Sequence, residues 1–530
     1  MPEIRRRRLL AATLAAPSLA APSLAAAQGA RTLRFVPQSD VTVLDPLWST
    51  AFVSRNHAYL VYDTLYGTDA NYQPRPQMAE GHVVEDGGLS WTITLRPNLR
   101  FHDGEPVRAA DAVASIRRWG ARDGFGQALL AATDELSALD DRRLRFRLKK
   151  PFPLLPAALG KTTVTVPFIM PERLARTDAA TQVSEIVGSG PYRFVANERV
   201  AGARTVYGRF DGYVPRERGA PSFTAGPKVA HLDRVEWIVM PDAATASAAL
   251  QAGEVDWWEQ ASTDLIPLLR RNRQIEVKAI ETAGWMGMLR FNHLQPPFDN
   301  PAIRRAILGA VNQADFMQAI VGQDPQLWRG ETGVYTPGTP LANDEGLAPL
   351  RSPRDIERVK RDLAAAGYRG ERVVLLVATD LPFVKAMSEV GADMFRRIGM
   401  NLDYQALDWG TVLSRRVSRE PVERGGWSAF FTFAGGLDFA SPAGHIALRG
   451  NGTNGWIGWP TSAELERLRD AWFDAPDLAA QQAIARQIQA RAMQEVPMIP
   501  LGQYFLATAH RRNLSDMLTG APLFWNVKKG

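Results

Sequence analysis

The chain has 530 residues, of which 45% are hydrophobic and 14 are tryptophan, enough for two or three domains with ordered cores. Its formal net charge is +6, and half of that comes from Arg5 to Arg8 set against Glu3. The weak charge that remains argues against a nucleic-acid-binding surface. The absence of cysteine excludes disulfides, thiolate metal sites and a lipid anchor at a leader cleavage site.

A leader peptide is expected over residues 1–27. Four arginines precede an apolar run, 9–21, that is too short to cross a hydrocarbon core of roughly 30 Å. Ala25-Ala26-Ala27 then fits the pattern that a signal peptidase cuts. The basic start suits either the general secretory or the twin-arginine route. Because no later segment is apolar over about 18 residues, we expect a periplasmic protein without a membrane anchor.

The first half of the chain alternates strand and helix patterns, as in an α/β protein. Residues 89–95 and 144–148 alternate apolar and polar side chains, which predicts two strands that each bury one face. Residues 109–119 predict a helix between them. We expect both strands in one antiparallel sheet. The glycine- and proline-rich stretch 202–228 indicates an ordered surface excursion.

The second half marks its helix boundaries more clearly. Asn300-Pro301 predicts a helix that begins with a cap and a proline at its first position. Ser352-Pro353 predicts the same for a helix that stops near residue 367. Thr461, with a glutamate three residues later, has the capping-box pattern.

Buried strands are predicted between these helices. The expected strands are 372–378, 402–406 and 428–433, and one further helix is expected over 478–494. This alternation predicts a second α/β lobe.

No catalytic motif stands out in the sequence. The seven histidines lack the spacing of a metal site, and phosphate-binding glycine loops are absent. Gly188-Ser189-Gly190-Pro191 predicts a turn rather than a nucleophile elbow, because Pro191 stiffens the backbone. Acidic residues are too many and too dispersed to single out a catalytic pair. We expect no metal, no cofactor and no enzymatic activity.

Several longer segments occur in a fixed order along the chain. They are 91–95 leading to 101–107 and Ala110-Asp111, then 188–194, 252–256, 291–292, 297–300 with 303–306, 398–400 and 408–409. Together they resemble the extracellular solute-binding proteins of family 5, the dipeptide- and oligopeptide-binding receptors of ATP-binding-cassette importers. Within them, 101–106 predicts a tight turn in which Gly104 takes a positive φ and Asp103 bonds nearby backbone.

The resemblance implies an α/β, two-lobed periplasmic binding protein of type II, the Venus-flytrap architecture. Lobe I would span 28–283 with an extra subdomain at 55–180, and lobe II would span 284–496. Residues 497–530 would return to lobe I. Two crossings would join the lobes, and a ligand would favour the closed form.

The resemblance also implies that an aspartate four residues before a proline binds the ligand's amino group. Asp438 has that spacing to Pro442, after Phe433, Gly435 and Gly436. An ammonium would provide the charge and the donors that a buried carboxylate needs. The alternative, an Asx turn or helix cap, stays open for Asp438. Ala434 and Ser441 depart from the family's usual residues, which puts an amine ligand in doubt.

Further ligand contacts are implied less directly. The family's first-lobe contacts would fall on Trp48 and Thr50, after the motif Leu44-Asp45-Pro46, with packing in the core as the alternative for Trp48. Lys385 is the only cation near the position where some relatives hold a carboxylate with an arginine. Trp409 and Trp427 would supply apolar walls or pack in the core.

These observations predict the substrate-binding component of an importer. The expected partners are a peptide or other small amine-bearing solute and an inner-membrane permease, with the protein a monomer that binds no nucleic acid. A secreted hydrolase that uses dispersed carboxylates, and a periplasmic sensor or chaperone partner without transport, remain alternatives.

Overall fold

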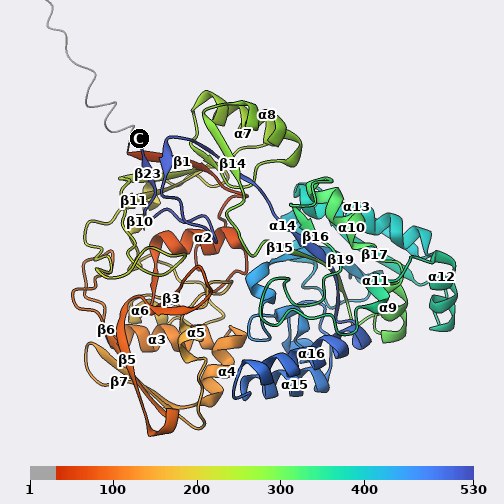
Figure 1. The fold of residues 1–530 in the computed structure, drawn as a ribbon, viewed down its shortest axis with the longest axis horizontal. Helices are drawn as coiled ribbons and strands as arrows, with labels where there is room; N and C mark the ends of the chain where they lie inside the picture. The colour runs from red at the N-terminus through yellow and green to blue at the C-terminus, as the bar shows by residue number, and fades with distance from the viewer. Residues whose placement is uncertain (1–30) are drawn as a thin grey trace, which may run out of the picture.

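The computed structural model describes residues 31–530, so the expected leader peptide lies outside the described residues. Two bodies lie side by side in Figure 1, one built mainly from the first half of the chain and one from the second. None of the helices within 31–530 combines the length and the apolar character that a membrane crossing needs.

Lobe I is built on a seven-stranded sheet. Strand β1 lies between β12 and β13 and runs parallel to both. Phe35 of β1 packs its ring 5.0 Å from those of Trp257 and Phe524, so the sheet and the C-terminal segment share one core. The strands, in spatial order, are β10 (Tyr192–Phe194), β11 (Arg204–Arg209), β12 (Arg234–Ile238), β1 (Thr32–Val36), β13 (Trp257–Trp258), β21 (Thr508–Arg511) and β14 (Ile275–Lys278).

Part of the stretch 202–228 does not lie on the surface, contrary to the sequence prediction. Strand β11 pairs with β10 and β12 inside the lobe I sheet, and Val206 and Tyr207 are fully buried. The strand buries three consecutive residues, Thr205 to Tyr207, instead of alternating, so the strand pattern is missing from its sequence.

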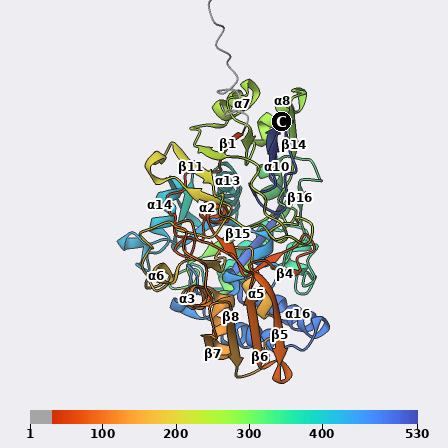
Figure 2. The same cartoon turned by 90° about the vertical axis from the view of Figure 1, so that its left-hand side faces the viewer.

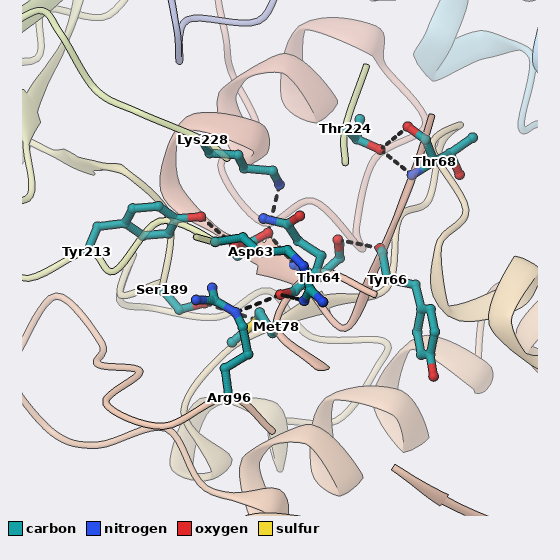
Figure 3. Close-up of polar contacts among 12 residues, drawn as sticks. Asp63, Thr64, Tyr66, Thr68, Met78, Arg96, Ser189, Tyr213, Thr224 and Lys228 are labelled. Carbon is teal, nitrogen blue, oxygen red and sulfur yellow. Dashed lines mark hydrogen bonds and ion pairs between the residues drawn. The ribbon is translucent and has the colours of Figure 1, made fainter. Parts of the chain in front are cut away.

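The chain after β11 is held down by a buried ion pair. Lys228 Nζ lies 2.7 Å from Asp63 Oδ1, and Tyr213 donates a 2.8 Å hydrogen bond to Asp63 Oδ2 (Figure 3). Both charged side chains are 1% exposed. These contacts attach the stretch 202–228 to β2 (Asp63–Thr64), which follows helix α2 (Phe52–Val61).

A four-stranded antiparallel sheet occupies the middle of the expected subdomain, 55–180, and lies at the opposite end of the molecule from β1 and α7 (Figure 2). The two predicted strands pair directly, with Trp91 opposite Phe146 and Ile93 opposite Leu144. Their buried faces pack with helix α3 (Ala109–Gly120) in one hydrophobic cluster. The sheet order is β5 (Ala79–Glu85), β6 (Ser90–Leu95), β8 (Arg143–Leu148) and β7 (Thr133–Ala138).

The turn after β6 forms as predicted. Gly104 has φ +91°, and Asp103 accepts a hydrogen bond from the Glu105 backbone. The remaining short elements of the first half are β3 (Tyr66–Thr68), β4 (Pro74–Pro76), α4 (Gly124–Ala132), α5 (Leu155–Leu159), β9 (Phe168–Ile169), α6 (Glu172–Ala175), α7 (Ala243–Ala252) and α8 (Ile266–Arg271).

Lobe II is built on a six-stranded mixed sheet that contains all three predicted strands, but β18 is an edge strand without a buried residue, so the predicted burial of 402–406 is wrong. Strand β19 pairs antiparallel with β15 and parallel with β17. The order is β16 (Trp328–Arg329), β20 (Met498–Tyr504), β15 (Trp285–Phe291), β19 (Ala429–Gly435), β17 (Arg372–Ala378) and β18 (Asn401–Leu407). Its helices are α9 (Pro301–Leu308), α10 (Gln313–Val321), α11 (Ala348–Arg351), α12 (Ile356–Ala365), α13 (Pro382–Arg397), α14 (Trp409–Arg415), α15 (Ala463–Phe473) and α16 (Leu478–Glu495).

The helix caps confirm one prediction and correct two. Asn300 caps α9 by accepting a hydrogen bond from Ala302 N. Helix α12 begins later than expected, because Asp355 rather than Ser352 provides the cap. Helix α15 is capped by Ser462, whose hydroxyl accepts from Leu465 N, and not by Thr461. In each corrected case a competent capping side chain lies closer to the first buried turn.

Two crossings connect the lobes. The first runs from the end of β14 at Lys278 to the start of β15 at Trp285, and the second from Tyr504 to Thr508. Because β20 pairs with β15, with Tyr504 opposite Trp285, residues 498–504 belong to lobe II. The expected boundary at 496 is therefore too early. The last strands, β22 (Leu514–Ser515) and β23 (Lys528–Lys529), pair with each other.

Candidate ligand-binding cleft

A cavity of about 540 Å³ lies between the two lobes, within the usual size range of small-molecule sites. Lobe I lines it with the loop before α2 and the first residues of that helix. Lobe II lines it with α14, β19 and the short helix η5 (Gly436–Phe439). The cavity therefore depends on both lobes.

Five of the residues predicted from the sequence line this cavity. They are Trp48, Thr50, Trp409, Phe433 and Asp438. Asp45 holds the loop that carries the first two of them: it accepts two hydrogen bonds from Arg118, at 3.2 and 2.8 Å, and one from Leu47 N. The motif Leu44-Asp45-Pro46 thus anchors the loop instead of meeting a ligand.

Gly435 and Gly436 lie beside the cavity, where the backbone approaches other parts of the chain closely. A Cβ on Gly436 would stand 2.0 Å from the carbonyl oxygen of Ala283 in the first crossing. A Cβ on Gly435 would stand 3.1 Å from the Phe52 ring. Gly436 needs to be glycine because of this close backbone approach, and Gly435 packs tightly against lobe I, so a ligand is not required to explain them.

Lys385 and Trp427 lie outside the cavity. Lys385 is on the solvent-facing side of α13, 46% exposed and 3.7 Å from Glu389. Trp427 is fully buried in lobe II, where its indole donates to Ser418 O and its ring packs against Phe430. Neither side chain belongs to the proposed site. Helix α13 places Lys385 toward solvent, and the packing of lobe II holds Trp427 in the core.

Asp438 forms the helix cap that the sequence left open as one interpretation. Its Oδ2 accepts a 3.0 Å hydrogen bond from Gly435 N, which caps the short helix η5. Its Oδ1 is buried and has no hydrogen-bond partner of good geometry among residues 31–530. Burial raises the pKa of this carboxyl to about 6, although Lys161, Arg55, the Thr163 side chain and the Gly435 backbone favour the charged form. One oxygen is therefore bonded by the fold, and the other is buried beside the cavity without a comparable bond.

Aromatic rings form the wall beside Asp438. The Phe433 ring lies 6.3 Å from Trp409, 5.4 Å from Trp285 and 6.1 Å from Phe52. Phe52 belongs to lobe I, and its ring also lies 4.6 Å from Trp285. The two lobes thus meet through aromatic contacts at the cavity, and an apolar ligand surface can continue this packing.

Arg416 also lines the cavity, and the sequence reading missed it. The residue follows α14 directly, and its guanidinium lies 5.6 Å from the Trp409 ring, 5.6 Å from Phe430 and 5.8 Å from Trp456. The spacing of seven residues from Trp409 places both on one face of the helix, which is a signal that the sequence contained.

A buried acidic cluster lies close to Asp438 and the first crossing. Arg55 donates to Glu281 at 3.3 Å and to Asn56, and Asn56 donates to Glu259 at 2.9 Å. The second oxygen of Glu259 accepts from Gln38 N. Burial raises the pKa of each glutamate to about 7. Neither glutamate lines the cavity, so this cluster connects α2 to the crossing.

Metal chemistry finds no support in the described part of the chain. Across residues 31–530, no three His, Asp or Glu side chains gather closely enough to hold a metal ion. The buried histidines His57 and His445 are hydrogen-bonded to Tyr207 and to Val334 O, and burial lowers the pKa of both to about 3.

Comparison with known proteins gives one consistent result. The sequence model of the family "Bacterial extracellular solute-binding proteins, family 5 Middle" matches residues 73–454. A probable peptide ABC transporter periplasmic-binding protein of Sinorhizobium fredii is 38% identical over 502 residues, which cover 94% of this chain and 93% of that protein.

Solved structures of low sequence identity share the fold. The DppA protein of Helicobacter pylori in complex with the peptide STSA superimposes with a TM-score of 0.77 at 20% identity, covering 95% of this chain and 99% of its own. The periplasmic binding protein AgaA of A. tumefaciens R10, in complex with agropinic acid, gives 0.77 at 20% identity, with 94% and 99% covered. The two-lobed α/β architecture expected from the sequence is thereby confirmed.

Proposed function

The chain belongs to the bacterial extracellular solute-binding proteins of family 5, and on this premise we propose that it captures a peptide or another small amine-bearing solute between its lobes and delivers it to an inner-membrane permease. The observation that carries the proposal is Asp438, a buried carboxylate with one unbonded oxygen in a cavity between two lobes. An ammonium group would supply the missing charge and donor together.

Closure over a ligand is supported by contacts between the lobes away from the cavity. Phe473 of lobe II lies 5.9 Å from the Phe125 ring and 6.1 Å from Phe152 in the subdomain. Arg469 of lobe II donates to Gly124 O. A ligand that contacts both lobes shifts the population toward this arrangement only through its higher affinity for the closed form.

The hydrolase alternative has less support. Glycosidase-type chemistry needs two carboxyl groups on either side of the scissile bond, and Asp438 is the only carboxylate among the described residues that line the cavity. We therefore propose a binding protein without catalytic activity. Export by the leader peptide, action in the periplasm and function as a monomer belong to the same proposal.

Thermal-shift screening tests the proposal. Pools of short peptides, amino-acid conjugates and sugars are added to the protein without its leader, and a ligand at 100 times its Kd stabilises by about 2.7 kcal/mol. In Asp438→Asn we expect the stabilisation by amine ligands to be lost, while the apo melting temperature stays nearly unchanged because an amide oxygen can still accept from Gly435 N. Glu423→Gln, an exposed acid of the same lobe, is the matched control.

Each contrary result has a separate meaning. A sharp fall in apo stability with binding retained would assign Asp438 to the helix cap alone. No stabilisation by any pool would count against a solute receptor and favour a sensor or chaperone partner. Turnover of a pool member would favour the hydrolase.

A further inference from the structure

Three buried carboxyl groups lie together where lobe I, lobe II and the first crossing meet. Glu259 follows β13 in lobe I, Glu281 lies in the crossing, and Asp438 belongs to η5 of lobe II. The charge of Asp438 acts on Glu281, and the charge of Glu281 acts on Glu259. The carboxyl cluster, defined by these three residues, therefore spans both lobes and the crossing between them.

Positive charge is scarce around the carboxyl cluster. Arg55 of α2 donates to Glu281 at 3.3 Å, and its charge also acts on the other two carboxyls. The Lys161 ammonium acts on Asp438 as well, but it is already paired with Asp123. Full ionisation of the cluster would hold like charges together in a buried region, which is costly. The charged and titratable side chains that face the cluster include Arg55, Lys161 with its partner Asp123, and Tyr59, whose hydroxyl donates to Thr162 O.

The burial of Asp438 depends on both lobes. Thr163, Lys161 and Arg55 face its carboxyl from lobe I, while the Gly435 backbone donates to it within lobe II at 3.0 Å. The bond to Gly435 survives any movement between the lobes, because both residues belong to lobe II. Opening of the cleft would remove the lobe I groups and expose this carboxyl to water.

Glu281 lies at the point where the crossing passes from one lobe to the other. Its carboxyl is bonded to Arg55 of lobe I, but three residues later Gly284 O accepts a 2.8 Å hydrogen bond from Gly436 N of lobe II. Bending of the crossing between these two contacts would separate Glu281 from Asp438. Glu259 differs, because both groups that donate to it belong to lobe I.

Closure of the lobes is therefore linked to proton uptake. Burial raises the pKa of Glu281 from 4.5 to about 7 and the pKa of Asp438 from 3.8 to about 6 in this closed arrangement. In an open form both carboxyls meet water, and their pKa values return toward the ordinary range. The closed form thus holds protons that the open form has lost, an advantage that disappears as the pH rises through the two raised pKa values. Each pKa unit of difference changes the ratio of the two forms about tenfold.

We propose that the carboxyl cluster is a pH-sensitive switch for lobe closure, in which protonation of Glu281 and Asp438 closes the ligand-free protein and ionisation of both opens it. The inference goes beyond the proposed function, because it concerns the protein without a solute. A receptor with this switch opens for capture near neutral pH and stays closed and empty in acid.

The first test follows closure of the ligand-free protein as a function of pH. The chain contains no cysteine, so Leu139→Cys in the subdomain and Leu478→Cys in lobe II, both at exposed positions, provide two unique sites for a donor and an acceptor dye. Bound solute is removed by unfolding and refolding, and single-molecule energy transfer then counts open and closed molecules at constant ionic strength. We expect the ratio of closed to open molecules to be higher at pH 5 than at pH 8 by about tenfold or more.

The second test assigns the pH response to the two carboxyls. Glu281→Gln and Asp438→Asn preserve the shape of each side chain and remove its titration, so in the labelled protein each should raise the closed fraction at pH 8 and weaken the pH response. The double variant should show a ratio that is nearly constant with pH. Glu423→Gln, an exposed acid of lobe II, should keep the response of the labelled parent, and circular dichroism verifies the fold of each variant.

The possible outcomes separate this inference from the proposed function. Equal ratios at pH 5 and pH 8 in the labelled parent, or more open molecules at pH 5, overturn the switch and leave a solute receptor standing. A full pH response in the double variant overturns the assignment to Glu281 and Asp438. A thermal-shift screen in which no solute binds counts against the proposed function, while the pH response of the ligand-free protein would still support the switch.

Discussion

Asp63 and Asp438 are both buried aspartates, but they differ in what surrounds them. Asp63 has both oxygens bonded, with the Lys228 ammonium on one and the Tyr213 hydroxyl on the other. Asp438 has one oxygen bonded to Gly435 N and one without a partner. The buried charge of Asp63 is thus fully satisfied by the fold, whereas the partly satisfied Asp438 beside the cavity needs a further explanation, which the proposed ligand would supply.

Removing the charged partner of Asp63 should destabilise the folded protein. In Lys228→Met we expect a loss of about 3–5 kcal/mol in the free energy of unfolding, because Asp63 stays buried without its counter-charge. Urea denaturation measures the change. Lys528→Met, which removes an exposed ion pair with Asp516, should cost less than about 1 kcal/mol.

A double variant checks the origin of this loss in stability. Asp63→Asn combined with Lys228→Met removes the uncompensated charge and should recover part of the stability. Equal losses in Lys228→Met and Lys528→Met would show that the buried pair contributes no more than a surface pair.

Glu259 is a third kind of buried carboxyl, because its oxygens are bonded to neutral groups only. Asn56 and the Gln38 backbone donate to it, and burial raises its pKa from 4.5 to about 7. Between those values the folded state keeps a proton that the unfolded state has lost, so this carboxyl lowers stability as pH rises. The stability of Glu259→Gln relative to the unmodified protein should therefore increase by about 2–3 kcal/mol from pH 4.5 to pH 8.

Urea denaturation at several pH values measures this difference. A constant offset is expected as well, since one side of the new amide cannot accept from Gln38 N. Glu254→Gln, an exposed acid of lobe I, should show a difference that does not vary with pH. A flat profile for Glu259→Gln would mean that the pKa of Glu259 is the same in the folded and the unfolded protein.

The smallest expected effect concerns the contact between the lobes outside the cavity. Phe473→Ala removes the ring that lies against Phe125 and Phe152, and each aromatic pair contributes about 0.5–1.5 kcal/mol. We expect three- to tenfold weaker binding of the short-peptide pool and a larger radius of gyration by solution X-ray scattering, because the closed form is less populated. Leu478→Ala, at an exposed site of lobe II, should change neither quantity.

An unchanged affinity in Phe473→Ala would mean that the contact between the subdomain and lobe II does not contribute to closure. The cleft would then be explained by its buried charges alone, without the contact that Phe473 makes.

Much of the fold could be predicted from local patterns. The strands over 90–95 and 143–148, the three predicted strands of lobe II and the helix after Asn300 all form close to the expected residues, because alternation and capping act over a few positions. The ordered motifs also indicated the family. Strand β11 escaped prediction, since its burial comes from its neighbours β10 and β12.

The site was predictable only in part, and the tryptophans and cations show why. Trp409 and Trp427 are equally apolar in the sequence, yet one lines the cavity and the other lies in the core. Lys385 points to solvent, while Arg416 lies within a group of aromatic rings. Which side of an element meets the cleft depends on its neighbours in the sheet.

Short-range patterns in the sequence predict the two α/β lobes, because they record which face of each element is buried. The ordered motifs indicate the family, and the resemblance implies the candidate aspartate. Only the folded chain shows that one oxygen of Asp438 and the Nε of Arg416 are buried without a hydrogen bond among the described residues. Both depend on segments far apart in the chain. Whether a buried charge is satisfied is a property of the assembled lobes.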